Sequence, residues 1–224
     1  MLKKLLRSLF ITWNDFASFF HLILPRSLGM RTGTGVYVRG GIQWALANVR
    51  NIELGNNVSL GKRGMFHLSP NNQAARIQIG SNTNIGNDFV ISAINSVKIG
   101  SDCLISYRVA IMDHSHVTGW GVKPVASGLT EGMAVEIGDR CFIGCGVVIL
   151  PGVKLGANCI VGSNSVVTKS FDAGSVVAGT RQDCCGALYR RKSEQICFFQ
   201  IPMNLQSGNE CFVRKFRVFT NSLI

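Results

Sequence analysis

Two histidines near the middle of the chain have the type and spacing to carry chemistry. They lie in the segment DHSH, which comprises Asp113, His114, Ser115 and His116. Because the pKa of an unperturbed imidazole lies near neutrality, either histidine could take the proton of a hydroxyl that attacks a carbonyl. The sequence shows no serine or cysteine with an obvious activating partner, so direct attack is favoured over a covalent enzyme intermediate. A hydrogen-bonded turn is the simpler interpretation of a single histidine, so the surrounding sequence has to decide.

The elements that must position these histidines follow a six-residue period. A glycine directly follows four of the recurring aliphatic residues, and a small or apolar residue lies four positions after each one. This spacing is neither the helical period nor the alternation of a strand. The pattern aliphatic-Gly-x-x-small-x is typical of a parallel β-helix, in which three hexapeptides close one triangular coil and like residues stack in successive coils. The aliphatic positions are Ile137, Ile143, Ile149, Leu155, Val161 and Val167.

The repeat is interrupted directly after the histidines. The interval from Ile99 to Ile137 is 38 residues (137 − 99), whereas one coil from Ile137 to Leu155 takes 18 (155 − 137). The excess of 20 residues (38 − 18) falls at 117–136. Insertions in solenoids gather on one face, often the binding face, and long insertions in compact arrays are usually functional. We therefore expect an exposed arm at 117–136 that borders the active site.

The segment VEIGDRCFIGCGVVILPGVKLGANCIVGSNSVVTKSF resembles the hexapeptide-repeat acyltransferases. Within that family it is most similar to the O-acetyltransferases of maltose, nodulation-factor and surface-polysaccharide type, and the resemblance extends over roughly 77–179. It implies a left-handed parallel β-helix, which is an exception to the right-handed rule for parallel crossovers. It also implies acetyl-CoA as the acyl donor, a saccharide hydroxyl as the acceptor, and a homotrimer with active sites shared between adjacent subunits.

The resemblance also assigns the catalytic base. In maltose-type relatives the catalytic histidine comes five residues after an inward aliphatic, and counting from Ile111 gives His116. His114 is the second candidate, with a role in orienting Asp113 or the substrate as the alternative. Asp113 and Trp120 are the candidate substrate residues. Trp120 lies in the expected arm and could stack on a sugar ring or anchor the arm against a neighbouring subunit.

The expected contacts to the acyl donor come from the last coils. In relatives the pantetheine arm of coenzyme A runs parallel to the solenoid axis past corner glycines, and the matching residues here are Gly144 and Gly162. Thr168 and Lys169 match the Thr-Lys pair near the adenine and phosphate end. A requirement of the turn itself is the other interpretation of each glycine.

Composition and charge narrow the class of protein. The 224 residues carry a formal net charge of +11, but the basic residues accompany no nucleic-acid recognition motif, so a nucleic-acid partner is not expected. Three of the eight cysteines, Cys103, Cys141 and Cys159, occupy the small inward place of the repeat. We interpret them as buried, reduced thiols, which favours a cytoplasmic protein. No metal is expected, since the zinc-binding histidine set of carbonic anhydrases with this fold is not evident.

The chain is expected to have three parts: a helical segment at 1–28, the β-helix at 29–186, and a basic, aromatic tail at 187–224. Residues 1–25 could contact the inner membrane face, although a helix that caps the solenoid is the alternative. The leading prediction is an acetyl-CoA-dependent O-acetyltransferase acting on a saccharide, in surface polysaccharide or its precursor. The alternatives are a catalytically silent solenoid used for binding, and an N-acetyltransferase acting on an amino sugar. His21 and His67 are interpreted as structural.

Overall fold

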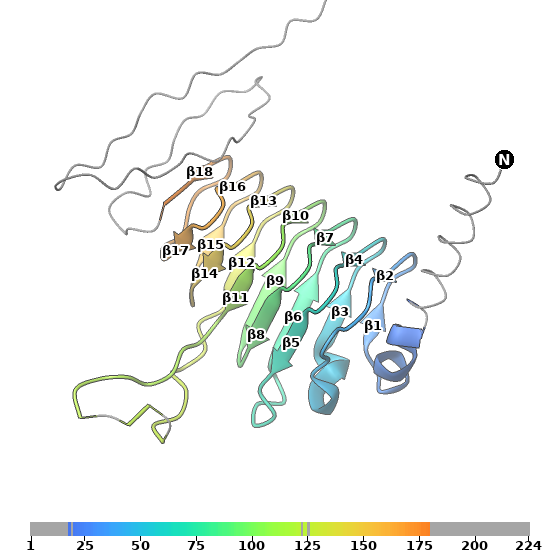
Figure 1. Ribbon diagram of the computed structural model, residues 1–224, viewed down its shortest axis with the longest axis horizontal. Helices are drawn as coiled ribbons and strands as arrows, with labels where there is room; N and C mark the ends of the chain where they lie inside the picture. Colours follow the sequence, from blue (N-terminus) through green and yellow to red (C-terminus); the bar gives the residue numbers. More distant parts are fainter. Residues whose placement is uncertain (1–17, 19, 122, 125, 180–224) are drawn as a thin grey trace, which may run out of the picture.

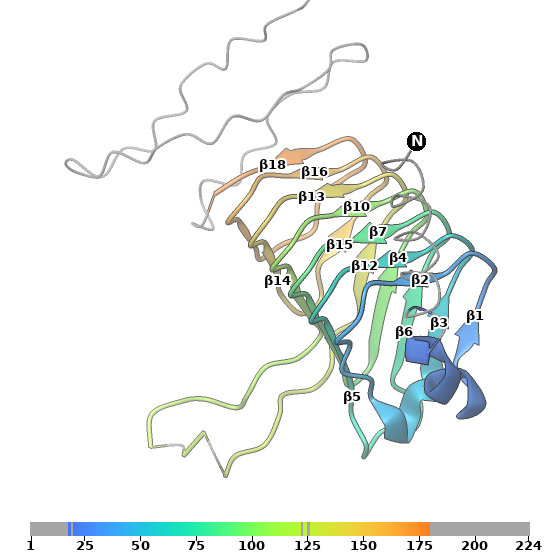
Figure 2. The same ribbon diagram turned by 45° about the vertical axis from the view of Figure 1, so that its right-hand side comes forward.

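The protein is a β-solenoid of short parallel strands. The computed structural model describes residues 18–179 apart from 19, 122 and 125. Its strands are two to four residues long and lie in three parallel sheets, and the chain passes from one sheet to the next in turn. The coils therefore stack along one axis, as Figures 1 and 2 show. This confirms the predicted all-β, parallel β-helix with a helical N-terminal segment and an inserted loop.

Sheet A carries a polar outward face. Its strand order is β1-β3-β6-β9-β12-β15. Lys98, Glu136 and Lys154 each precede the last inward aliphatic of their strand; they point outward and are exposed, while their neighbours in the chain are buried. The strands are β1 (Arg31–Thr32), β3 (Ile52–Leu54), β6 (Arg76–Ile79), β9 (Ser96–Ile99), β12 (Val135–Ile137) and β15 (Lys154–Leu155).

Sheets B and C form the other two faces. Sheet B has the order β18-β16-β13-β10-β7-β4-β2, and sheet C has the order β17-β14-β11-β8-β5. The strands of sheet B are β2 (Tyr37–Val38), β4 (Ser59–Leu60), β7 (Asn84–Ile85), β10 (Leu104–Ile105), β13 (Phe142–Ile143), β16 (Ile160–Val161) and β18 (Val176–Val177). The strands of sheet C are β5 (Met65–Leu68), β8 (Val90–Ala93), β11 (Ala110–Met112), β14 (Val148–Ile149) and β17 (Val166–Val167).

The core consists of like residues stacked from coil to coil. Ile137 pairs in register with Ile99 on one side and with Leu155 on the other, and all three are buried. The predicted column of cysteines is also buried, and its thiols are free. The Sγ atom of Cys141 lies 3.3 Å from the carbonyl oxygen of Gly156 in the next coil. The adjacent thiols, and then burial, raise the pKa of the Cys141 thiol, which keeps it protonated.

Two of the three edges of the prism have a fixed length. Every connection from sheet A to sheet B between β3 and β16 has four residues, for example 80–83, and so has every connection from sheet B to sheet C after β4, for example 86–89. We call these the A–B edge and the B–C edge. The connections from sheet C to sheet A, which we call the C–A edge, vary in length. They span 69–75, 94–95, 113–134, 150–153 and 168–170.

The longest connection of the C–A edge forms an arm that extends from the solenoid (Figures 1 and 2). Its base is an antiparallel ribbon in which His116 pairs with Leu129, and the amide of Thr130 donates to the carbonyl of Ser115 over 2.8 Å. The predicted arm, 117–136, overlaps the observed connection, 113–134. The last two residues of the predicted range belong to β12, because Val135 is in register with Val97 and is buried.

A short helix covers the first coil. Residues 20–27 are helical, and Leu22 is buried against the solenoid while Ser18 accepts a hydrogen bond from the amide of Val38. A 3-10 helix, η1 (Leu46–Asn51), crosses the C–A edge before β3. Among the residues described, none of the helical segments has the length and apolarity needed to cross a membrane. Most of the segment predicted to contact a membrane, and the predicted tail at 187–224, lie outside the described residues.

Because inward side chains stack in a column, substitutions at two adjacent residues of β9 should differ strongly in their effect on the free energy of unfolding. Ile99 is 1% exposed, whereas Lys98 in the same strand points outward and is exposed. We expect Ile99→Ala to lower the free energy of unfolding by about 2–5 kcal/mol, because it leaves a cavity in a packed column. Lys98→Ala, the matched control, should change it by less than about 0.5 kcal/mol. Urea unfolding followed by circular dichroism measures both, and equal losses would contradict the stacked core.

Candidate active site

The C–A edge gathers the polar side chains that could do chemistry. His114 and His116 follow β11, His67 lies in β5, and Thr168 and Lys169 follow β17. All five residues therefore lie on or beside one edge of the prism, although they come from different coils. The prediction that the insertion borders these histidines is consistent with this placement, because the arm begins at the same edge.

Asp113 is the anchor of this edge. Its side chain is completely buried, and its two carboxylate oxygens accept hydrogen bonds from three consecutive backbone amides, those of Ile94, Asn95 and Ser96, over 2.7–2.9 Å. Ile94 and Asn95 form the connection between β8 and β9, and Ser96 is the first residue of β9, so all three amides lie in the preceding coil. The carboxylate thus ties two coils together at the point where the repeat carries extra residues. A substrate contact, which the sequence suggested for Asp113, does not match a carboxylate that is fully enclosed by the protein.

His114 is oriented by the same carboxylate. Its Nδ1 atom lies 2.8 Å from Oδ1 of Asp113, and its side chain is 10% exposed. A carboxylate that already accepts three amide hydrogens acts as an acceptor, so Nδ1 of His114 is the donor in this bond. In the neutral imidazole the proton then lies on Nδ1, and Nε2 carries the free lone pair. The arrangement gives His114 the tautomer that a general base requires.

His116 has different surroundings. It is exposed, and its backbone pairs with Leu129 at the base of the arm. Within the described part of the chain no hydrogen bond orients its ring, whereas His114 has a buried partner. The two candidates are therefore separated by geometry: one imidazole is held in a defined tautomer, and the other is an exposed side chain at the root of the arm.

Sequence reasoning missed a third histidine at this edge. The Nδ1 atom of His67 lies 2.9 Å from the hydroxyl of Ser92, and the ring centroids of His67 and His114 are 6.3 Å apart. The signal was present in the repeat, because Phe66, Ile91 and Ile111 occupy equivalent places. His67 follows Phe66 as Met112 follows Ile111, which places it on the column that leads to the DHSH segment.

The predicted contacts to the acyl donor divide between two edges. Thr168 and Lys169 lie on the C–A edge, where Lys169 is exposed and Thr168 is half-buried. Gly144 and Gly162 lie on the B–C edge of the same chain, away from the histidines. A Cβ atom on Gly144 would lie 2.6 Å from the backbone nitrogen of Ser163. The close approach of the next coil therefore accounts for this glycine without any ligand.

Trp120 lies in the arm and is fully exposed. Its side chain therefore makes no close contact with the rest of the described chain, and the structure does not bring it to His114. A tryptophan exposed on a projecting arm is available for contact with a ligand or with a second chain, and tryptophan is enriched among the residues that anchor interfaces.

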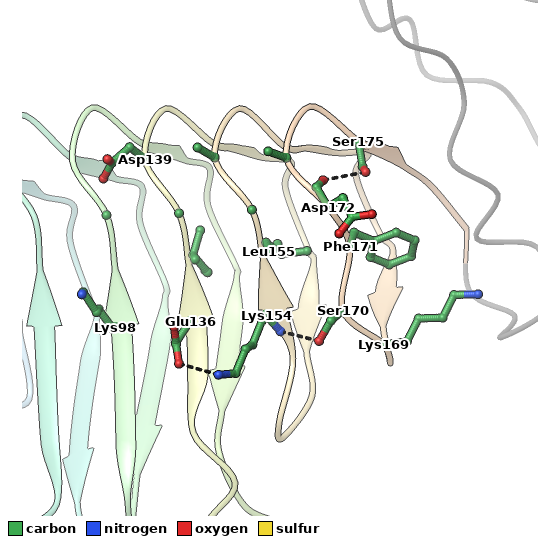
Figure 3. Close-up of a pocket in the computed structure, with 16 residues that line it drawn as sticks. Lys98, Glu136, Asp139, Lys154, Leu155, Lys169, Ser170, Phe171, Asp172 and Ser175 are labelled. Carbon is green, nitrogen blue, oxygen red and sulfur yellow. Dashed lines mark hydrogen bonds and ion pairs between the residues drawn. The ribbon is translucent and has the colours of Figure 1, made fainter.

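A shallow groove lies elsewhere, on the outward face of sheet A (Figure 3). Its volume is about 950 Å³, and Lys169 and Ser170 connect it to the C–A edge. Glu136 and Lys154 cross it as an exposed ion pair of 2.9 Å. Lys169 also lies at one end of the groove, with Nζ 5.8 Å from the ring of Phe171. The groove contains no histidine, so the candidate base lies outside it and the candidate site is assigned to the C–A edge.

Comparison with known proteins agrees with this fold. Residues 134–169 match the family model "Bacterial transferase hexapeptide (six repeats)". The chain is 41% identical over 101 residues to the putative lipopolysaccharide biosynthesis O-acetyl transferase WbbJ of Escherichia coli. The aligned region covers 42% of this chain and 52% of that protein. The chain is 33% identical over 106 residues to the galactoside O-acetyltransferase of Escherichia coli, covering 45% and 51%. The chain thus spans about half the length of these curated relatives.

Solved structures share the solenoid at lower identity. AntD, an N-acyltransferase from Bacillus cereus in complex with dTDP and 3-hydroxybutyryl-CoA, has a TM-score of 0.58 at 19% identity, covering 69% of this chain and 81% of that chain. The hexapeptide-repeat acetyltransferase VCA0836 from Vibrio cholerae has a TM-score of 0.51 at 23% identity, covering 72% and 76%. These structures support the fold, and the family model with the curated relatives confirms the predicted resemblance to the hexapeptide-repeat acyltransferases.

The bonds of Asp113 lead to a stability prediction. Asp113→Asn replaces one accepting oxygen with a donating NH2 group, so at least one buried donor loses its partner. We expect a loss of about 1–3 kcal/mol in the free energy of unfolding. Asp139→Asn is the control, because its side chain is exposed and one oxygen can still accept the bond from the Ser101 amide. Denaturant melts that shift equally for the two variants would show that Asp113 does not anchor this edge.

Proposed function

We propose that the protein is an acetyl-CoA-dependent O-acetyltransferase that moves an acetyl group to a hydroxyl of a saccharide. The observation that carries the proposal is the buried bond between Asp113 and His114, which leaves the lone pair of Nε2 free at the edge of a hexapeptide-repeat solenoid. The sequence relatives support this chemistry, since WbbJ and the galactoside enzyme are both O-acetyltransferases by name. In this proposal His114, rather than His116, is the catalytic base.

The reaction follows from the free nitrogen of His114. Nε2 takes the proton of the acceptor hydroxyl as its oxygen attacks the carbonyl carbon of the thioester. The resulting tetrahedral intermediate collapses, the carbon–sulfur bond breaks, and the imidazolium returns the proton to the departing thiolate. The products are an acetyl ester and coenzyme A. Asp113 acts as a positioning residue, since it fixes the tautomer of His114 and stabilises its positive charge while the proton is held.

The C–A edge also offers a place for the acyl donor. Lys169 and Thr168 lie on this edge, two coils beyond His114 along the axis. A thioester at His114 with its pantetheine arm parallel to the axis would bring the phosphate end toward the exposed ammonium of Lys169. We therefore retain Lys169 and Thr168 as donor-binding residues.

Gly144 and Gly162 fit the proposal only if a second copy of the chain takes part. They lie on the B–C edge, so one chain cannot present them and His114 to the same donor along one edge. In a homotrimer the B–C edge of one subunit could face the C–A edge of its neighbour. The exposed Trp120 on the projecting arm supports this assembly, because an arm that reaches a neighbour would cover it.

An N-acetyltransferase acting on an amino sugar is the second candidate. The shared solenoid of AntD, an N-acyltransferase, favours it, but the identity is 19% and carries the fold alone. The 41% identity to an O-acetyl transferase over 101 residues gives the hydroxyl the stronger support. A panel of sugars and amino sugars separates O-acetylation from N-acetylation. Hydroxylamine cleaves an acetyl ester but leaves an acetyl amide intact.

Replacing His114 and His116 one at a time tests the assignment of the base. We expect His114→Asn to lower kcat by roughly a hundredfold or more, because the base is removed while the shape is kept. His116→Asn, the matched control two residues away, should retain activity within about threefold. Release of free thiol from acetyl-CoA in the presence of the sugar panel measures both. Loss of activity in His116→Asn alone would transfer the role to His116, and normal activity in both would reject the mechanism.

The assembly is tested through Trp120. We expect the full chain to have three times the mass of one chain by light scattering, and Trp120→Ala to weaken the trimer by about 2 kcal/mol or more, as is typical of a central aromatic anchor. Leu129→Ala offers a control in the same arm with an exposed side chain. A monomer that has full activity at low concentration would exclude a shared site.

A further inference from the structure

His67 is a chemically active side chain that the proposed reaction does not use. It lies in β5, where Phe66 and Leu68 point into the core and are buried, so His67 points outward from sheet C. In the parallel register His67 lies opposite Ser92 of β8, and Ser92 lies opposite Met112 of β11. The column therefore ends one residue before Asp113 and two before His114.

Ser92 fixes the ring of His67. Its hydroxyl lies 2.9 Å from Nδ1 of His67, and Ser92 is 7% exposed although it points outward from the sheet by alternation. The side chains of the neighbouring coils thus cover this serine. The result is a second imidazole that is held through Nδ1 by a partner in the protein and leaves Nε2 for a ligand.

The two held imidazoles lie beside each other. Their ring centroids are 6.3 Å apart, and their planes are inclined by 44°. Rings at this separation are close neighbours, so a pair of oxygen atoms on one ligand can reach hydrogen-bonding distance of both imidazoles. A saccharide offers such a pair of oxygens as hydroxyls on adjacent carbons.

We propose that His67, held by Ser92, binds the hydroxyl next to the one that reacts, and so selects acceptors that carry two adjacent hydroxyls. This inference rests on the proposed function, in which Nε2 of His114 takes the proton of the reacting hydroxyl. His67 is a positioning and specificity residue in this scheme: it holds the acceptor so that the correct hydroxyl meets His114. It takes no part in breaking the thioester.

The test compares a sugar with its deoxy analogue. The methyl glycosides of glucose, galactose and mannose are screened first, and the acetylated carbon of the best acceptor is located by NMR. The single-deoxy analogue that lacks the adjacent hydroxyl is the probe. The native protein should lose about tenfold or more in kcat/KM with that analogue, because a site built to bind a hydroxyl rejects a ligand without it.

His67→Ala should remove this discrimination. We expect its kcat/KM to fall about tenfold for the parent glycoside and to stay unchanged for the deoxy analogue, so that the ratio approaches one. The KM for acetyl-CoA should not move. His67→Gln keeps a hydrogen-bonding group and should restore part of the ratio. His21→Gln, in the N-terminal helix, is the matched histidine control, and thermal melts of all variants show that they fold.

Two outcomes overturn the inference. If His67→Ala discriminates against the deoxy analogue as the native protein does, His67 does not bind that hydroxyl. If it loses activity equally on both acceptors, its role is structural. Failure of the proposed function looks different: native protein that acetylates none of the glycosides rejects the reaction, and full activity of His114→Asn rejects His114 as the base. Either result removes the ground for this inference.

Discussion

One constraint governs the solenoid: each coil must place its inward side chains over those of the coil before it. The aliphatic columns, such as Ile99, Ile137 and Leu155, are buried only because their neighbours along the axis bury them. The parallel ladders then fix the register, since a shift by one residue would turn every inward side chain to the surface. The A–B and B–C edges keep four residues per connection for this reason. The C–A edge is the place where the chain departs from this spacing.

The variable length of the C–A connections explains how the candidate site is built. Extra residues at 69–75, 94–95 and 113–134 all lie on the C–A edge, as do His114 and His116, and His67 lies beside this edge in β5. Irregular backbone leaves amides without a partner in the ladder, and Asp113 satisfies three of them where β8 passes into β9. The same carboxylate orients His114. In the proposed reaction, one side chain therefore both satisfies the backbone of the fold and orients the base.

The fold was predictable because a period of six residues is a repeated signal with a single physical meaning. The place of the insertion followed from the same counting, since an excess of 20 residues between Ile99 and Ile137 must leave the array somewhere. The site was less predictable, because roles within DHSH depend on contacts across coils. Nothing adjacent in sequence indicates that Asp113 reaches the amides of residues 94–96, or that His67 lies 6.3 Å from His114. The offset between coils changes at the C–A edge, so these contacts appear only when the register is known.

The unequal edges also bear on how such a chain could diversify. The connections of the A–B and B–C edges keep a fixed length of four residues, so a residue gained or lost there would displace every later coil. The C–A edge tolerates such changes, and it is also the edge on which the proposed acceptor site lies. New acceptor preferences could therefore arise through changes in the length or sequence of the C–A connections. The rest of the solenoid, which provides stability, would stay unchanged.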